Sequence, residues 1–442
     1  MRATATLPET EAEPTPMHEP EPEAEPEPAP GAEPRPDQVL AWRLRPLQVG
    51  VALQNMLLWV PVEKMFMTQI GFDAAAIGLV AAVYAAVAPV LEVPFGILAD
   101  RWNRTGMVIL ATLALAASSL VGGLSTTPAT YVGAAVLLGV FFALNSGTVE
   151  SIVYDTVVEE TGSGDGYERW IGRMHVVEAA ALVASAVLGG VLAAVASARV
   201  TYFATVPLMA AAALAFGRCH EPRLHRHAQR VTFRRQALAT VRVLAADRAL
   251  RPVVLLSALT AVVIQVVFGF GPLWLVSLHA PAALYGPYWA ALVSTGGLGG
   301  WLVSRTRLDR PAVTVGFGAL LVLAAILPTL GHCLAVVIAG QFVVALAAGM
   351  ISIRAGRLLH DAVGAQLRAG VTSGAGTLSW LVFLPVSVLF GQLSRRHGVQ
   401  TAGLLPVLLA LAMAALLAHT SRRPHPVADT GPQAAESTIT AA

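Results

Sequence analysis

The hydrophobic pattern of this chain is a series of apolar stretches, each about 20 residues long, that starts at Leu47 and is interrupted by short polar segments. An α-helix needs about 20 apolar residues to cross the roughly 30 Å hydrocarbon core of a bilayer. The pattern therefore predicts an all-α integral membrane protein with twelve transmembrane helices. We expect these helices at residues 47–66, 74–99, 106–125, 129–154, 171–195, 200–217, 252–277, 284–303, 312–330, 333–353, 369–392 and 400–419.

The polar segments divide the chain into five parts. Residues 1–38 hold ten acids and almost nothing to bury, so we expect a disordered cytoplasmic tail, and residues 420–442 are expected to form a second one. Residues 39–217 and 252–419 each contain six predicted spans and are expected to form an N-terminal and a C-terminal lobe. Residues 218–251 form a basic linker with apolar residues at helical spacing, which predicts an interfacial helix against anionic lipid.

The distribution of basic residues predicts the orientation in the membrane. If both termini are cytoplasmic, 25 of the 29 basic residues fall on the inner side, which is where lysine and arginine accumulate in membrane proteins. The sequence therefore predicts a multi-pass protein of the plasma membrane with two cytoplasmic termini. The outer side keeps only Lys64, Arg199, Arg395 and Arg396.

The composition excludes several other classes of protein. Lys64 is the sole lysine, so a phosphate-binding loop ending in Gly-Lys-Ser/Thr is absent and the chain is not its own ATP-driven motor. The linker arginines lack an aromatic stacking surface, so we expect no nucleic-acid partner. Cys219 and Cys333 fall on opposite sides of the predicted membrane, so no disulfide is expected. His220 and His225 near Cys219 are interpreted as a surface loop, and we predict no metal site and no cofactor.

A short pattern recurs in the chain. Gly-x-Leu closes the second, fifth, eighth and eleventh predicted spans, at Gly96, Gly190, Gly300 and Gly391. Each copy ends the middle helix of a three-helix unit, alternately inside and outside the membrane. This register predicts inverted three-helix repeats within two six-helix halves.

The stretch at residues 92–104, with Glu-x-Pro-x-Gly-x-Leu-Ala-Asp-Arg at its start, resembles the loop between the second and third helices of the major facilitator superfamily of secondary transporters. Residues 146–155 are similar to the end of the fourth helix in a bacterial subgroup often grouped with drug exporters. The resemblance covers roughly residues 40–420. The chain departs from the family pattern at Asn103, where glycine is usual, and at Ser304, where the second-half copy would have an acid. The patterns of sugar transporters are missing, which argues against sugar uptake.

The resemblance implies a two-lobed fold with a central cavity and an alternating-access cycle. It also implies that a charged latch on the inner surface holds the lobes while the cavity faces outward and breaks when the cavity opens inward. The alternative is a static ion network that fixes two helices. The predicted latch consists of Gly96, Asp100, Arg101, Arg104 and Asp155.

Carboxylates inside the predicted membrane are candidates for proton coupling. A charge in mid-membrane costs at least about 2.5–3.5 kcal/mol, so such a group must be paired, protonated or facing water. Structural pairing with nearby arginines is the favoured alternative for these acids, and Glu63 with Lys64 is predicted to form an outer-rim pair. The candidate proton-coupling or charge network consists of Glu92, Glu150, Glu178, Arg169, Arg173 and His175.

Polar and aromatic residues within the spans are candidates for the wall of a substrate cavity, although each could instead serve helix packing. Together these features predict a transporter, not an enzyme, that exports a small drug-like compound or metabolite in exchange for protons. A proton-coupled importer is the alternative, and a non-transporting sensor or a membrane-embedded enzyme is less favoured. The expected partners are a small-molecule substrate, protons and the lipid bilayer, and the chain is expected to be monomeric. The candidate cavity residues are Gln54, Asn55, Tyr84, Asn145, Gln265, Gln341 and Trp380.

Overall fold

The structure is a computed structural model, and its regular elements are all helices in the parts of the chain that it describes. The predicted tails and the predicted interfacial helix of the linker lie almost entirely outside these parts. The described residues are 36–101, 103–164, 166–221, 250–306, 310–362 and 365–421.

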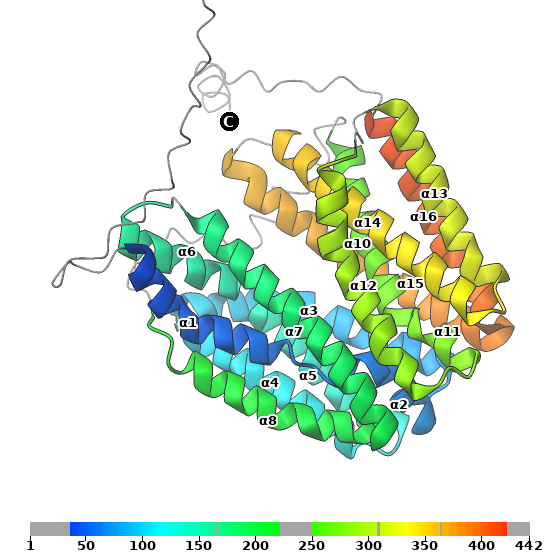
Figure 1. Ribbon diagram of the computed structural model, residues 1–442, viewed down its shortest axis with the longest axis horizontal. Helices are drawn as coiled ribbons and strands as arrows, with labels where there is room; N and C mark the ends of the chain where they lie inside the picture. Colours follow the sequence, from blue (N-terminus) through cyan, green and yellow to red (C-terminus); the bar gives the residue numbers. More distant parts are fainter. Residues whose placement is uncertain are drawn as a thin grey trace, which may run out of the picture.

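The first half of the chain forms one lobe, on the left and bottom of Figure 1. Its elements are α1 (Pro36–Gln54), the short 3-10 helix η1 (Val60–Val62), α2 (Glu63–Gln69), α3 (Ala74–Arg101), α4 (Arg104–Leu124), α5 (Pro128–Asn145), α6 (Thr148–Thr161), α7 (Tyr167–Val195) and α8 (Ala198–Phe216).

The second half forms the other lobe, on the right of Figure 1. Its elements are α10 (Arg251–Phe270), α11 (Pro272–Ser277), α12 (Ala282–Val303), α13 (Pro311–Leu330), α14 (Leu334–Ala362), α15 (Ala365–Ala402) and α16 (Leu404–Ser421).

Ten helical segments among the described residues are long and apolar enough to cross a membrane. The predicted spans that are not among these ten are 47–66 and 284–303. The first is divided between α1 and η1–α2, and the second coincides with α12, whose glycines, tyrosines and tryptophans lower its hydropathy. The ten segments make the chain a multi-pass membrane protein. The predicted number of twelve spans stays a prediction.

One predicted span is not a continuous helix. The span predicted at 129–154 is interrupted because Gly147 adopts a left-handed conformation, with φ 66°, between α5 and α6. The prediction of an uninterrupted helix was wrong there because hydropathy does not register a local change of backbone conformation. The span predicted at 252–277 comprises α10 and α11, and Gly271 between them keeps helical dihedral angles. The backbone also leaves helical geometry at Gly398 within α15, where φ is 85°, in the segment between the predicted spans 369–392 and 400–419.

The two lobes pack on each other chiefly through α3 with α15 and α7 with α12. They diverge toward the end where α1 begins and α16 ends, at the upper left of Figure 1. We call this the terminal end, and the other the closed end. One hydrophobic core crosses between the lobes at the closed end, since Phe66 and Tyr131 belong to the same buried cluster as Phe270 and Phe383.

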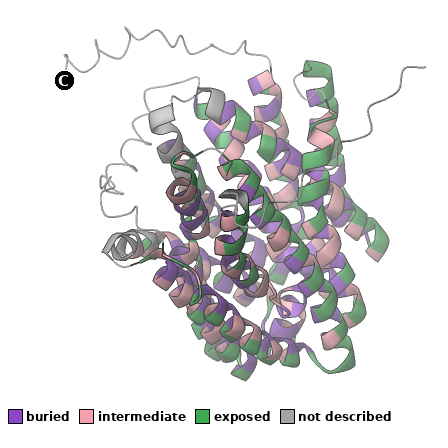
Figure 2. Ribbon diagram, turned by 60° about the vertical axis from the view of Figure 1, so that its left-hand side comes forward, coloured by how far each residue is buried: buried purple, intermediate pink, exposed green. Residues whose placement is uncertain are grey.

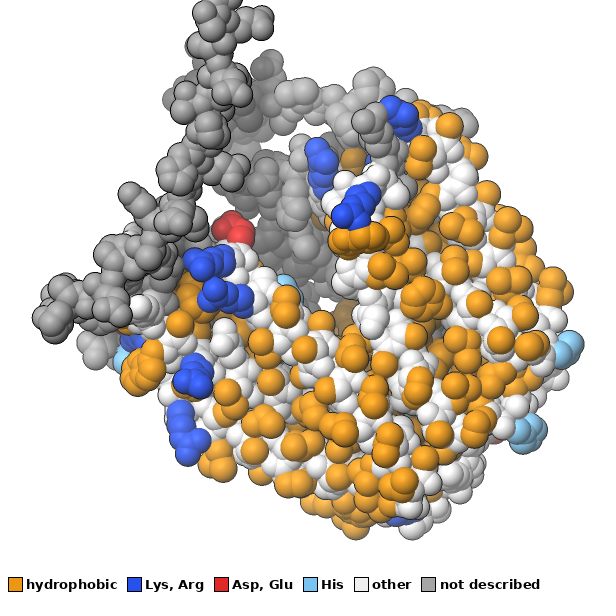
Figure 3. All heavy atoms as spheres, in the orientation of Figure 1, with side chains coloured by type: hydrophobic (Ala, Val, Ile, Leu, Met, Phe, Trp, Pro, Cys, Tyr) orange, Lys and Arg blue, Asp and Glu red, His pale blue; other side chains and the backbone are white. Residues whose placement is uncertain are grey.

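The outer surface has the polarity expected of a membrane protein. Large apolar side chains such as Leu79, Leu214 and Leu323 are exposed, and Figure 2 shows exposed positions along the outward faces of the helices. In Figure 3 hydrophobic side chains spread over both lobes, and most of the basic side chains in view lie near the ends of the lobes. An apolar band with charged ends is what a bilayer requires.

Candidate functional site

Two pairs of glycines bring the lobes into backbone contact at the closed end. A Cβ built on Gly78 of α3 would lie 2.5 Å from the carbonyl oxygen of Ser387 and 2.9 Å from the Cα of Gly391, both on α15. A Cβ built on Gly190 of α7 would lie 2.6 Å from the Cα of Gly286 on α12. Small residues permit such close approach of helices within a membrane. Two of the repeated Gly-x-Leu glycines, Gly190 and Gly391, are therefore contact points between lobes.

An ion pair also joins the lobes at the closed end. Arg395 of α15 lies 3.8 Å from Asp73, which precedes α3, and both side chains are about half exposed. Asp73 also accepts a hydrogen bond from the backbone N–H of Ala76 at 2.7 Å and so caps α3. An exposed pair of this kind contributes about 0–1 kcal/mol, so it adds little to the closure.

A buried ion pair lies in the first lobe next to the closed end. Lys64 is 7% exposed, and its ammonium lies 2.6 Å from a carboxylate oxygen of Glu63. The Tyr131 hydroxyl donates to the other Glu63 oxygen at 3.1 Å and lies 2.8 Å from the Tyr202 hydroxyl. The predicted pair of Glu63 and Lys64 is thus present, with Lys64 buried and Glu63 partly buried beside two tyrosines, and its place at the outer rim stays a prediction.

A pocket lies between the lobes one helical turn from the contact of Gly190 with Gly286. Its cavity volume is about 140 Å³. The Ser185 hydroxyl and the Trp289 indole nitrogen are buried without a hydrogen-bond partner among the described residues. The rings of Phe268 and Trp289 pack with their centroids 4.9 Å apart. The pocket is lined by Leu57, Val60, Pro61, Leu182, Ser185, Ala186, Phe268, Trp289 and Val293.

Two of the predicted cavity residues meet across the lobe interface. Tyr84 of α3 packs edge-on against Trp380 of α15, with ring centroids 6.2 Å apart. Phe142 of α5 contacts both rings, each at 6.2 Å between centroids. The sequence analysis did not include Phe142, because the only available signal was its place within an apolar span.

Other predicted cavity residues lie inside a lobe. Gln54 is buried and donates to the Thr112 hydroxyl at 2.8 Å, and Asn55 donates to the carbonyl of Val51 at 2.9 Å. Gln265 and Asn145 each have a buried amide oxygen without a partner among the described residues. The contact of Gln54 with Thr112 is a helix-packing contact, which was the alternative to a place in the cavity wall.

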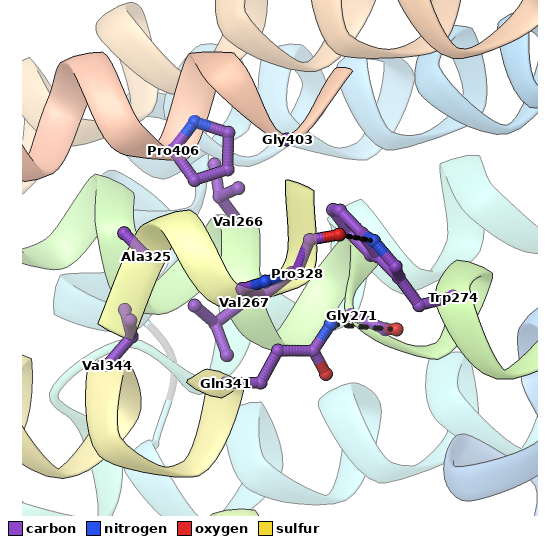
Figure 4. A pocket seen from close by; sticks show the side chains of 10 residues that line it. All are labelled: Val266, Val267, Gly271, Trp274, Ala325, Pro328, Gln341, Val344, Gly403 and Pro406. Carbon is purple, nitrogen blue, oxygen red and sulfur yellow. Dashed lines mark hydrogen bonds between the residues drawn. The ribbon is translucent and has the colours of Figure 1, made fainter. Parts of the chain in front are cut away.

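Gln341 belongs to a second and smaller pocket, of about 30 Å³, within the C-terminal lobe. It accepts a hydrogen bond from the Tyr288 hydroxyl at 2.7 Å and donates to the carbonyl of Gly271 at 3.4 Å. Figure 4 shows this side chain beside Trp274, whose indole N–H donates to the carbonyl of Pro328 at 2.9 Å. All the polar groups named here are paired, and the lining comes from one lobe only.

The predicted latch is partly described. Arg104 lies 2.6 Å from the carboxylate of Asp155, so these two predicted members do meet. The side chains of Gly96, Asp100 and Arg101 lie outside the described part of the chain. Their place on α3 is nevertheless given by the backbone, which is helical through Arg101.

Two further residues organise the start of α4 beside this pair. Glu221 accepts hydrogen bonds from the backbone N–H groups of Arg104, at 2.8 Å, and Thr105, at 3.0 Å. Asn103 caps the same helix by accepting from the N–H of Gly106, which gives the departure from the family pattern a structural role. A carboxylate at a helix N-terminus is favourable because the exposed N–H groups and the helix dipole attract negative charge.

The candidate proton network is dispersed. The Glu92 side chain lies outside the described residues, and Glu150 is exposed. Glu178 pairs with His175 at 3.5 Å, and both are partly exposed. Arg173 stacks over the ring of Trp170 at 4.5 Å, and Arg169 is exposed. The sequence analysis did not predict the nearby ion pairs of Arg43 on α1 with Glu159 and Glu160 on α6.

Comparison with solved structures gives the same two-lobed arrangement. The nucleoside transporter NupG is 14% identical, with a TM-score of 0.69 over 86% of this chain and 99% of that one. A bacterial homologue of the human lysosomal transporter Spinster, in an inward-facing and occupied conformation, is 15% identical, with a TM-score of 0.68 over 89% and 98%. A D-xylose–proton symporter is 13% identical, with a TM-score of 0.62 over 84% and 97%. Identities this low show the fold alone.

Sequence comparison identifies the family. No curated relative matches the chain by sequence. The family model described as Major Facilitator Superfamily matches residues 46–380, which is most of the chain. The chain therefore belongs to the Major Facilitator Superfamily.

Proposed function

We propose that this protein is a secondary active transporter that moves a small organic molecule across the membrane by alternating access. The observation that carries this proposal is the pocket between the lobes, which lies directly beside the backbone contact of α7 with α12. A molecule in that pocket touches both lobes, and separation of Gly190 from Gly286 would expose it at the closed end. Family membership supports a transporter and not an enzyme.

The topology that completes this proposal has twelve spans in two six-helix lobes, built from inverted repeats, with both termini in the cytoplasm. The closed end then faces outward, and the described conformation opens toward the cytoplasm. In this scheme the pair of Arg104 and Asp155 belongs to the cytoplasmic latch, together with Gly96, Asp100 and Arg101. Opening of one end and closure of the other would follow from a shift between two states of the lobes.

We further propose proton-coupled export as the direction and coupling. The similarity of residues 146–155 to a subgroup grouped with drug exporters supports export, as does the apolar lining of the pocket. Import coupled to protons is the second candidate. It is favoured by the D-xylose–proton symporter among the structural neighbours, although that likeness concerns the fold.

The test is uptake and efflux of varied fluorescent compounds in an efflux-deficient host that expresses the protein. Export predicts lower accumulation with the wild type than with an empty vector, and loss of the difference when a protonophore collapses the proton gradient. Higher accumulation of a compound with the wild type than with the empty vector would indicate import and not export. Unchanged accumulation and survival across chemically varied compounds would remove the support for export.

A further inference from the structure

We propose that the pocket lined by Ser185, Phe268 and Trp289 is the binding site for an uncharged, largely apolar ring compound that carries a hydrogen-bond acceptor. This inference rests on the proposed transport function and specifies its substrate class. The site combines residues of η1 and α7 from the first lobe with residues of α10 and α12 from the second.

The pocket lining carries no charge. None of the nine described residues that line the pocket is ionisable. An ion that entered would lose its hydration without gaining a partner, at a large cost in free energy. The pocket therefore selects uncharged molecules.

The Ser185 hydroxyl lacks the hydrogen bond that comparable hydroxyls make. Hydroxyls within these helices usually donate to the carbonyl one turn earlier, as Ser119 does to Leu115 at 2.9 Å and Thr112 does to Val108 at 2.7 Å. Ser185 is only 2% exposed, yet its hydroxyl has no partner among the described residues. A buried polar group without a partner is unfavourable, so a ligand that reaches this hydroxyl would supply the missing partner.

The Trp289 indole is the second group available to a ligand. The buried indoles of Trp59 and Trp274 each donate, to the Ser119 hydroxyl at 3.1 Å and to the carbonyl of Pro328 at 2.9 Å. The Trp289 N–H has no acceptor among the described residues. An indole can only donate, so the missing partner must be an acceptor, such as a carbonyl or ether oxygen. Ser185, on the facing lobe, can donate to the same kind of group.

The shape of the lining defines the rest of the ligand. Phe268 and Trp289 pack at an interplanar angle of 46° and present ring surfaces to the pocket, while Leu57, Val60 and Val293 supply aliphatic surface. Flat apolar rings pack well on such surfaces. The cavity volume of about 140 Å³ lies below the usual range for ligand sites, so the pocket holds at most one small molecule.

Occupancy of the pocket is linked to closure of the lobes. Ala186 lines the pocket, and its carbonyl oxygen would lie 2.7 Å from a Cβ on Gly286. A ligand that contacts Ser185 and Trp289 together bridges α7 and α12 at this point. Binding should therefore favour the conformation in which these helices are in contact.

The experiment uses three naphthalene probes of similar size on the purified full-length protein in lipid nanodiscs, without any gradient. These are 1-acetylnaphthalene (a neutral acceptor), 1-isopropylnaphthalene (no acceptor) and 1-naphthoate (an anion). We expect the ketone to bind most tightly and the anion not to bind. Ser185→Ala and Trp289→Phe should each weaken the ketone about tenfold and leave the hydrocarbon unchanged. Ser294→Ala and Trp301→Phe on the exposed face of α12 are matched controls.

Equal affinity for the three probes, or equal losses in the control variants, would overturn the assignment. If Trp289→Phe does not fold, Val293→Phe replaces it, because a larger side chain should fill the pocket and abolish binding of ketone and hydrocarbon alike. Continued binding to Val293→Phe would also overturn the assignment. If the three probes bind as expected but the protein transports none of them in cells, the binding site is supported and the proposed transport function is contradicted. Transport of the ketone with unchanged binding in both pocket variants would contradict the site alone.

Discussion

Gly190 of α7 and Gly286 of α12 approach each other so closely that a Cβ on either residue would meet the backbone of the other helix, at 2.6 Å in one case and 2.7 Å in the other. Backbone atoms cannot move aside as the end of a flexible side chain can. The closed end of the molecule therefore depends on glycine at both positions, and the same holds for Gly78 with Gly391.

Replacing Gly190 with alanine should hold the closed end apart. Overpacking of this kind costs about 1–3 kcal/mol, which corresponds to a shift of roughly 5- to 150-fold toward the conformation open at that end. The expected result is faster modification of a cysteine placed in the pocket, at Leu182 in a Cys333→Ser background, by a membrane-impermeant reagent added from the outside of cells. Gly297→Ala is the control, because a Cβ there meets nothing within 4 Å. Equal rates of cysteine modification in the Gly190→Ala and Gly297→Ala variants would show that a Cβ at residue 190 does not hold the closed end apart.

Removing the charge of Glu63 should destabilise the protein strongly. Glu63→Gln leaves the Lys64 ammonium buried without its carboxylate, and breaking a buried pair in this way costs about 3–5 kcal/mol. Thermal unfolding in detergent should show a clearly lower midpoint. The double variant Glu63→Gln with Lys64→Met should recover most of the loss, and a double variant as unstable as the single one would argue against the pair as the cause.

Glu221 should stabilise the start of α4. Glu221→Ala removes the acceptor for the N–H groups of Arg104 and Thr105, so we expect a loss of about 1–2 kcal/mol, in the range of helix caps. Glu221→Gln keeps one acceptor oxygen and should lose less. The thermal unfolding midpoint should be highest for the wild type, lower for Glu221→Gln and lowest for Glu221→Ala. Identical midpoints would show that the Glu221 carboxylate does not stabilise α4.

The two cysteines provide a test of orientation. Burial, and secondarily the Glu221 carboxylate, raises the pKa of the Cys219 thiol to about 12, so it stays protonated and unreactive near neutral pH. Cys333 is exposed in the segment between α13 and α14. An impermeant maleimide at pH 7.5 should therefore label intact cells at Cys333, and Cys333→Ser should abolish the labelling. The Cys219 reaction in opened membranes should accelerate as the pH rises toward 12. Labelling of Cys333 only from the cytoplasmic side would reverse the topology.

The apolar pattern and the local signals were sufficient for much of the fold. The pairing of Arg104 with Asp155 followed from the family pattern, and the Asp73 cap is a local signal because its partner lies three residues away. The interruption at Gly147 was missed although Ser146 and Gly147 are a recognisable turn signal, because the surrounding apolar run was read as one helix.

The pocket could not be predicted, because it depends on contacts between residues far apart in the chain. Ser185 is an ordinary member of an apolar span, and only its position opposite Trp289 across the lobe interface brings two polar groups without partners to one pocket. The burial of Lys64 was missed for a similar reason. A charged residue near a predicted span end reads as a rim residue until the tyrosines that surround it are placed by α5 and α8.

The most direct test of alternating access measures the two ends of the molecule in the same sample. Spin labels at the exposed Leu79 of α3 and Leu389 of α15 report on the closed end, and labels at Tyr154 of α6 and Ile353 of α14 report on the terminal end. Pulsed electron resonance distances in nanodiscs, with and without Gly78→Ala, should show the first pair lengthen as the second pair shortens. Both distances unchanged, or both longer together, would contradict the alternation of the two ends.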